Sequence, residues 1–153
     1  EFDIEWFKEV FNELKPLPKV EPITNSGKKI VELNYADIHI GLRGLSYEDE
    51  LNEMTDKIID YHKDADVFIL PIGQDLLNSD HSVDGALATK KGTIVESELS
   101  YREMSQSGLR VCLRIINNIV EKTNAKVDCL YVKGNHDEQS CYGVFMALMQ
   151  KYE

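Results

Sequence analysis

The feature that most limits the fold of this chain is an almost wholly apolar run, "DVFILPIG", at residues 66–73. A strand that lies inside a parallel sheet and is covered on both faces has this continuous apolar pattern. Runs rich in β-branched and apolar residues also occur at residues 29–41 and 126–132. We therefore predict three strands, and we expect the one at 66–73 to be buried on both faces.

Segments with helical periodicity alternate with these strands, at residues 46–65, 97–123 and 140–152. Apolar residues recur in them at intervals of three and four, and Ser46 is a suitable N-cap for the first. The predicted inward positions are Leu51, Met54, Ile58 and Ile59 in the first helix and Leu109, Cys112, Ile116, Ile119 and Val120 in the second. The alternation predicts an α/β domain with a layered, mainly parallel sheet flanked by helices.

Two segments lie outside this alternation. Residues 1–28 are expected to form an N-terminal helix, at about 3–15, and a proline-containing linker, and we expect the helix to pack on the domain that starts at residue 29. Residues 74–96 form a long polar stretch, which we predict to be a functional or mobile loop.

Composition excludes several classes of protein. No apolar run approaches the roughly 18 residues that a membrane helix needs, so we expect no membrane partner and a cytoplasmic location. The formal net charge of −10 argues against a surface-wide grip on nucleic acid, although clustered carboxylates that hold cations would also make a nuclease acidic. The three cysteines form no CxxC pair, so we expect free thiols and no zinc knuckle.

Polar residues with metal-binding or proton-transfer chemistry follow each predicted strand. In an open parallel sheet the loops at the carboxyl ends of the strands converge at one edge, which is where ligands bind. The residues at these ends are Asp37 and His39 after the first strand, Asp75 and Asn78 after the second, and Asn135, His136 and Asp137 after the third. Their coincidence predicts one site.

The spacing suggests a role for each of these residues. Residues two apart in an extended strand point to the same face, so Asp37 and His39 can reach one cation together. Asp75 has two oxygens and can bridge to a second cation, to which Asn135 can offer its amide oxygen. We expect Mn²⁺, with Fe, Zn²⁺, Co²⁺ or Mg²⁺ as other candidates. His136 could protonate the leaving oxygen of a phosphoester.

The motifs "DIH", "GQDLLN" and "GNHD" resemble, in this order, the first three signatures of the calcineurin-like metallophosphoesterases. The resemblance covers about residues 29–140, and "ILPIGQDLLNSD" followed by "KKGT" is similar to phage and prophage members. It implies half of a four-layer αββα fold and two divalent metal ions. It also implies Asp37 and His39 on the first metal, Asp75 as the bridge, Asn135 on the second metal and His136 as the acid.

The resemblance also implies ligands that this sequence lacks. Three further histidines of the family follow the third signature, whereas the remaining histidines here are His62 and His81. We therefore expect residues 29–153 to be the N-terminal half of a longer enzyme whose C-terminal half completes the site. Metal binding and activity of these residues alone should be weak, and the oligomeric state is open.

The predicted function is hydrolysis of phosphodiester bonds, DNA among the candidate substrates, by a hydroxide that bridges two metal ions. The alternatives are a phosphomonoesterase or protein phosphatase, or a degenerate binding module without catalysis. Asn78, Asp137 and His81 are weaker candidates, either to orient the metal ligands or to contact substrate. Lys90 and Lys91 could meet a phosphate, although solvation is the simpler reading.

Overall fold

The computed structural model describes residues 27–42 and 48–152. Its elements, in chain order, are β1 (Ile30–Glu32), α2 (Glu48–Tyr61), β2 (Val67–Gly73), β3 (His81–Val83), β4 (Ala86–Ala88), α3 (Tyr101–Lys122), β5 (Lys126–Val132) and α4 (Glu138–Tyr152). The predicted helix at 3–15 and the predicted N-cap Ser46 lie outside the described residues.

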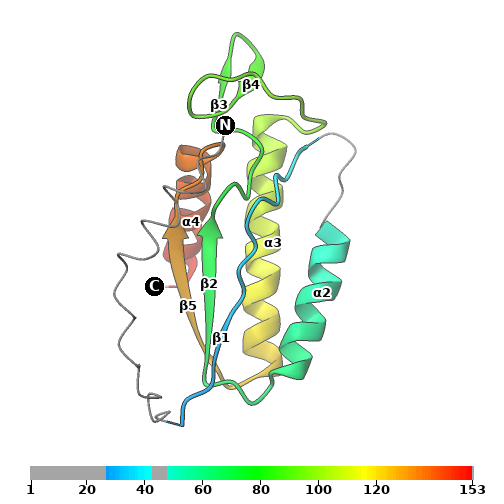
Figure 1. The fold of residues 1–153 in the computed structure, drawn as a ribbon, viewed down its shortest axis with the longest axis vertical. Coiled ribbons are helices and arrows are strands. Elements are labelled where there is room, and N and C mark those ends of the chain that lie inside the picture. The colour runs from blue at the N-terminus through cyan, green and yellow to red at the C-terminus, as the bar shows by residue number, and fades with distance from the viewer. Residues whose placement is uncertain (1–26, 43–47, 153) are drawn as a thin grey trace, which may run out of the picture.

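The three predicted strands form one parallel sheet in the order β1-β2-β5, with β2 in the centre. Phe68 of β2 pairs with Val31 of β1 and Val127 of β5, which fixes the register across the sheet. Helices α3 and α4 pack on the sheet, and α2 packs on α3 (Figure 1). The prediction of a layered α/β domain with a mainly parallel sheet is therefore confirmed.

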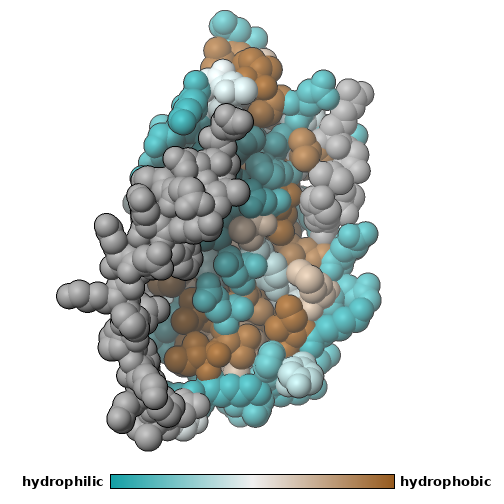
Figure 2. Space-filling model, viewed as in Figure 1, coloured by the Kyte–Doolittle hydropathy of each residue, from teal (hydrophilic) through white to brown (hydrophobic). Residues whose placement is uncertain are grey.

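The central strand β2 is not equally covered on its two faces. Phe68, Leu70 and Ile72 are buried toward the helices, whereas the intervening Val67, Ile69 and Pro71 are only partly buried. Figure 2 shows hydrophobic surface over the lower part of the sheet in this view. Within the described part of the chain the helices thus cover one face fully, and the expectation of burial on both faces was too strong.

The first strand is much shorter than predicted. It ends at Glu32, and residues 33–42 continue as a loop with a single bridge between Ile40 and Leu77. Leu33 still donates its N–H to the Ile69 carbonyl at 2.9 Å, after which the two chains leave the regular ladder. Asp37 and His39 therefore lie in a loop and not in an extended strand.

The predicted loop at 74–96 is largely ordered. It contains the β3–β4 hairpin, which projects beyond the carboxyl ends of the strands in Figure 1. Residues 78–80 before the hairpin are buried, and so are Ala88 at the end of β4 and Thr89 after it. The return segment is attached by the Val95 N–H, which donates to the Leu87 carbonyl at 2.9 Å.

Both later helices begin at other residues than predicted. Helix α3 starts at Tyr101, because Ser100 and Glu103 form a capping box there, and α4 starts at Glu138. In the core, Ile116 and Ile119 are buried as predicted. Val120 and Met54, however, are 60% and 47% exposed, so their assignment to inward stripes was wrong.

The three cysteines are free, as expected, with Cys112 and Cys141 buried and Cys129 partly buried. Among the helices of residues 27–42 and 48–152, none combines the length and the apolar character that a membrane crossing requires.

Candidate metal centre

Two loops at the carboxyl end of the sheet run side by side and build the candidate site. The N–H of Asp37 donates to the Gln74 carbonyl at 2.8 Å, and the N–H of His39 donates to the Asp75 carbonyl at 2.9 Å. These bonds bring one ligand atom each of Asp37, His39 and Asp75 within 4.8 Å of one another. The structure thus brings together three of the four predicted metal ligands, from two segments of the chain.

The backbone conformation that achieves this is not the predicted one. Asp37 and His39 have φ values of 57° and 51°, and Gln74 and Asp75 have 53° and 63°. All four residues occupy the left-handed region, which is uncommon for residues other than glycine and costs free energy. The prediction that extended-strand alternation aligns Asp37 with His39 is therefore wrong. Such strained positions concentrate at functional sites.

Glycines permit the close approach of the segments behind the site. A Cβ on Gly73 would lie 1.7 Å from the Val132 carbonyl oxygen, and one on Gly134 would lie 2.2 Å from Asp75 Oδ1. Contacts this short do not occur, so both positions require glycine. Asp75 is only 7% exposed, and its Oδ1 accepts the backbone N–H of His136 at 2.7 Å. The loop after β5 is thereby fixed onto the loop after β2.

His136 packs against His39 at this junction. Their ring centroids are 4.5 Å apart with an interplanar angle of 77°. The Nδ1 atom of His136 lies 3.2 Å from the backbone carbonyl of Asn78. Because a carbonyl oxygen only accepts hydrogen bonds, this contact requires a proton on Nδ1. The Nε2 atom of His136 is therefore the ring nitrogen that can exchange a proton with a ligand.

The remaining ligand candidates differ in exposure. Asn135 precedes His136 and is exposed, and the Asp37 carboxylate is exposed as well. His39 is mostly buried, with Nε2 at 3.7 Å from Asp37 Oδ1. Two of the four candidate ligands, Asp75 and His39, are therefore largely buried, and the other two are exposed.

Asp137 lies behind the metal candidates and is fully buried. Its Oδ2 accepts the backbone N–H of Leu77 at 2.9 Å, which joins the loop after β5 to the loop after β2 a second time. Burial raises the pKa of this carboxyl from its ordinary value of 3.8 to about 6, the Leu77 N–H opposes the shift, and the Asp75 carboxylate adds to it. Asp137 is thus placed to hold the loop after β2 in position, and its carboxyl is not exposed to a ligand.

The side chain of Asn78 and the backbone of His81 both make contacts in the region of the hairpin. The Asn78 side chain donates to the Glu96 carbonyl at 2.7 Å, so it holds the segment that returns from the hairpin. Its contact with the site is made by its backbone carbonyl, through His136. His81 begins β3 and pairs with Ala88, which places it in the hairpin ladder.

Asp80 is a structural residue that sequence reasoning missed. It is 2% exposed, and its Oδ1 accepts the backbone N–H groups of Gln139 and Ser140 at the start of α4. Ser140 Oγ in turn donates to the Ser79 carbonyl at 2.8 Å. A carboxylate at a helix N-terminus is favourable. These partners are about 60 residues apart in the chain, so no local pattern could have indicated the pairing.

The residues present fit a divalent cation. Protein ligands lie about 2.0–2.6 Å from such ions, so ligand atoms within 4.8 Å of one another can share one. Two carboxylates and an imidazole suit Mn²⁺, Fe, Zn²⁺ or Co²⁺. The buried Nδ1 atom of His39 also has no hydrogen-bond partner. A bound cation would supply a partner for an imidazole nitrogen of this kind.

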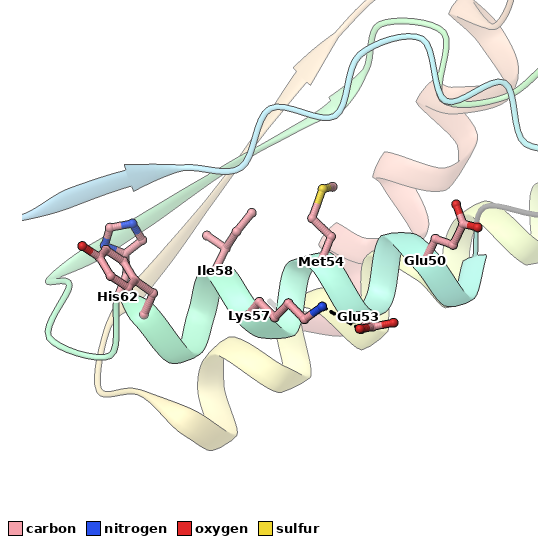
Figure 3. Close-up of a pocket in the computed structure, with 7 residues that line it drawn as sticks. Glu50, Glu53, Met54, Lys57, Ile58 and His62 are labelled. Carbon is pink, nitrogen blue, oxygen red and sulfur yellow. Dashed lines mark hydrogen bonds and ion pairs between the residues drawn. The ribbon is translucent and has the colours of Figure 1, made fainter.

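A second hollow lies along α2, and two of its lining residues, Glu50 and Met54, also line a smaller hollow with Asp37. It is lined by one face of this helix, including Met54 and Ile58, and by His62, which directly follows the helix (Figure 3). Its acidic and basic side chains Glu53 and Lys57 already form an ion pair with each other at 2.6 Å. The hollow contains none of the predicted site residues, and no set of ligand atoms converges there within the described ranges. The loop site is therefore the better candidate.

Comparisons of the chain with family models, with curated proteins and with solved structures found no match. The class of protein is therefore defined by fold and site alone. It is an α/β domain with a candidate Asp-His-Asp cation site at the carboxyl end of a parallel sheet.

Proposed function

We propose that this chain provides a metal-dependent phosphoesterase site that hydrolyses phosphodiester bonds, with DNA as one candidate substrate. The observation that carries the proposal is the convergence of Asp37, His39 and Asp75, which arises from two loops held in strained conformations. Bound divalent cations would supply the positive charge that neutralises a phosphoryl group and lowers the pKa of an attacking water.

Each residue of the site has a defined part in this proposal. Asp37, His39 and Asp75 would hold the first cation, and Asp75 with Asn135 would hold the second. His136 donates a proton from Nε2 to the leaving oxygen, since Nδ1 is occupied by the Asn78 carbonyl. The Asp75 carboxylate also accepts the backbone N–H of His136, so the candidate acid is fixed relative to a candidate metal ligand. A group held in place before reaction lowers the entropy that the reaction must lose.

The number of ligands sets the expected affinity. One cation would have two protein ligands besides the bridging Asp75, and the other would have one. Both coordination shells would therefore stay open. Mn²⁺ should therefore bind weakly, and turnover should be low. The same count supports the alternative that the domain is a binding module without catalysis.

Isothermal titration calorimetry with Mn²⁺ tests the proposal on the chain as it exists. The unchanged chain should bind Mn²⁺ weakly, and Asp75→Asn should lower the affinity by about tenfold or more, as losses of groups around metal sites do. Asp60→Asn, an exposed carboxylate of α2 in an ion pair with Lys63, is the matched control. Equal binding by Asp75→Asn and the unchanged chain would contradict the proposal, and tight two-site binding would contradict the expectation of open coordination shells.

Hydrolysis separates the remaining alternatives. Aryl phosphodiesters and aryl phosphomonoesters should be compared at saturating Mn²⁺, with His136→Ala as a second variant. A preference for the diester supports the proposal, and a preference for the monoester supports a phosphomonoesterase. Mn²⁺ binding without turnover of either ester would favour the binding module.

A further inference from the structure

An ion pair connects the hairpin region to the start of α4, next to the candidate site. Lys90 Nζ, in the turn after β4, contacts a carboxylate oxygen of Glu138. Glu138 is the first residue of α4 and follows Asp137 directly, two residues after His136. The lysine ammonium group is therefore held close to the loop that carries the proposed acid.

The turn that carries Lys90 has a fixed position. The Gly92 N–H donates to the Thr89 carbonyl at 2.8 Å, and the Thr89 N–H donates to the Thr93 carbonyl at 2.9 Å. The base of the hairpin is attached to α4 through Asp80, whose carboxylate accepts N–H groups of that helix. Both partners of the ion pair therefore belong to segments whose backbones are held together independently of the pair.

The charges around the candidate site suggest what the ion pair between Lys90 and Glu138 does. The site presents the carboxylates of Asp37 and Asp75, and Asp137 lies behind them, so an approaching phosphate meets negative charge. Lys90 supplies a compensating positive charge at this edge. The charge of Lys133, like that of Lys90, lowers the pKa of the Glu138 carboxyl. The Lys90 and Glu138 side chains are 45% and 29% exposed. An ion pair this exposed contributes little to stability, so exchange of its acceptor is easy.

We propose that Lys90 is a phosphate-contacting residue of the site, and that Glu138 competes with the phosphate for its ammonium group. This inference rests on the proposed function, which supplies the phosphoester. In the free protein the lysine is held ready by Glu138. On binding, a phosphate oxygen replaces the carboxylate as its acceptor. Removal of the lysine and removal of the glutamate charge should therefore have opposite effects on phosphate binding.

Fluorescence anisotropy with a short single-stranded deoxyoligonucleotide, in excess Mn²⁺ and over a series of salt concentrations, tests this. Lys90→Ala should weaken binding about fivefold at 0.1 M salt and lower the slope of log affinity against log salt by about 0.7, the value for one lost phosphate contact on a single strand. Glu138→Gln should strengthen binding. Lys57→Ala and Glu53→Gln, which break an exposed ion pair on α2, should change neither quantity.

The outcomes separate the two proposals. Equal weakening by Lys90→Ala and Glu138→Gln would mean that the pair is only structural and would overturn the inference. No effect of Lys90→Ala, or no oligonucleotide binding by the unchanged chain while Mn²⁺ is bound, would overturn it as well. Absence of Mn²⁺ binding in calorimetry, with the Lys90 effect intact, would contradict the proposed function alone. Unchanged far-ultraviolet circular dichroism and melting temperature should accompany each exposed substitution.

Discussion

The backbone N–H of His136 donates a 2.7 Å hydrogen bond to the Asp75 carboxylate, which joins two loops that are 61 residues apart in the chain. Asp75 is therefore both a candidate metal ligand and the anchor of the candidate acid. A change at either loop should affect cation binding and loop position together. The first prediction uses this coupling.

Gly134→Ala should disrupt the site. The added Cβ would lie 2.2 Å from Asp75 Oδ1 and 2.3 Å from Asp137 Oδ1, so both carboxylates would have to move. We expect a loss of about 1–3 kcal/mol in the free energy of unfolding, typical of a strained substitution, together with loss of Mn²⁺ binding. Thermal melting and calorimetry measure the two effects.

Gly143→Ala is the matched control for that substitution. Gly143 lies within α4, and apart from its chain neighbours and the backbone of its own helix no atom lies within 4 Å of an added Cβ. Alanine is favoured over glycine in a helix by about 1 kcal/mol, so this variant should melt higher and bind Mn²⁺ unchanged. Similar destabilisation by both variants would contradict the steric argument.

Gln74→Gly should stabilise the fold. Gln74 has a φ of 53°, a conformation that costs about 1–2 kcal/mol for an L-residue and that glycine adopts freely. Part of this gain is offset because glycine makes the unfolded chain more flexible, so we expect a net gain of up to about 1 kcal/mol.

Chemical denaturation measures the stability of the Gln74→Gly variant. Gln106→Gly is its control, for which we expect the opposite effect. Gln106 is exposed within α3, where glycine is unfavourable by roughly 0.5–1 kcal/mol, so this variant should be less stable. Destabilisation by both substitutions would show that the loop at Gln74 is not strained.

Neighbouring residues of α3 should respond differently to truncation. Ile119 is fully buried, and Ile119→Ala should lower the free energy of unfolding by about 2–5 kcal/mol through lost burial and the cavity left behind. Val120 is 60% exposed, and Val120→Ala should change it by less than about 0.5 kcal/mol. Urea unfolding of both variants measures these free energies. Equal losses of stability would contradict the assignment of Ile119 to the buried face of α3 and of Val120 to the exposed one.

The thiols should be unreactive in the folded protein. Burial raises the pKa of the Cys112 thiol to about 12. The pKa of the Cys141 thiol is also raised, by burial and by the nearby Asp137 carboxylate. At pH 8 a thiol with a pKa of 12 is about one ten-thousandth thiolate, and the thiolate is the reactive form. An aromatic disulfide reagent should therefore label partly buried Cys129 first and all three thiols only in denaturant. Rapid labelling of all three in the native protein would contradict the described core.

Local patterns predicted much of the fold and the candidates of the site. Apolar periodicity predicted three strands, three helices and their parallel arrangement, because burial of a face imposes a repeat on neighbouring residues. The polar residues after these strands indicated Asp37, His39 and Asp75 as site candidates, because parallel strands bring their carboxyl ends to one edge of the sheet.

The sequence alone determined which residue types reach this edge of the sheet, but only the tertiary structure decided how they meet. The left-handed turns at His39 and Gln74, the ordered hairpin and the contact of Asp80 with α4 all depend on hydrogen bonds between segments far apart in the chain. Such bonds leave no repeat in neighbouring residues. They form because buried N–H and carbonyl groups must find partners once the sheet has brought the loops together.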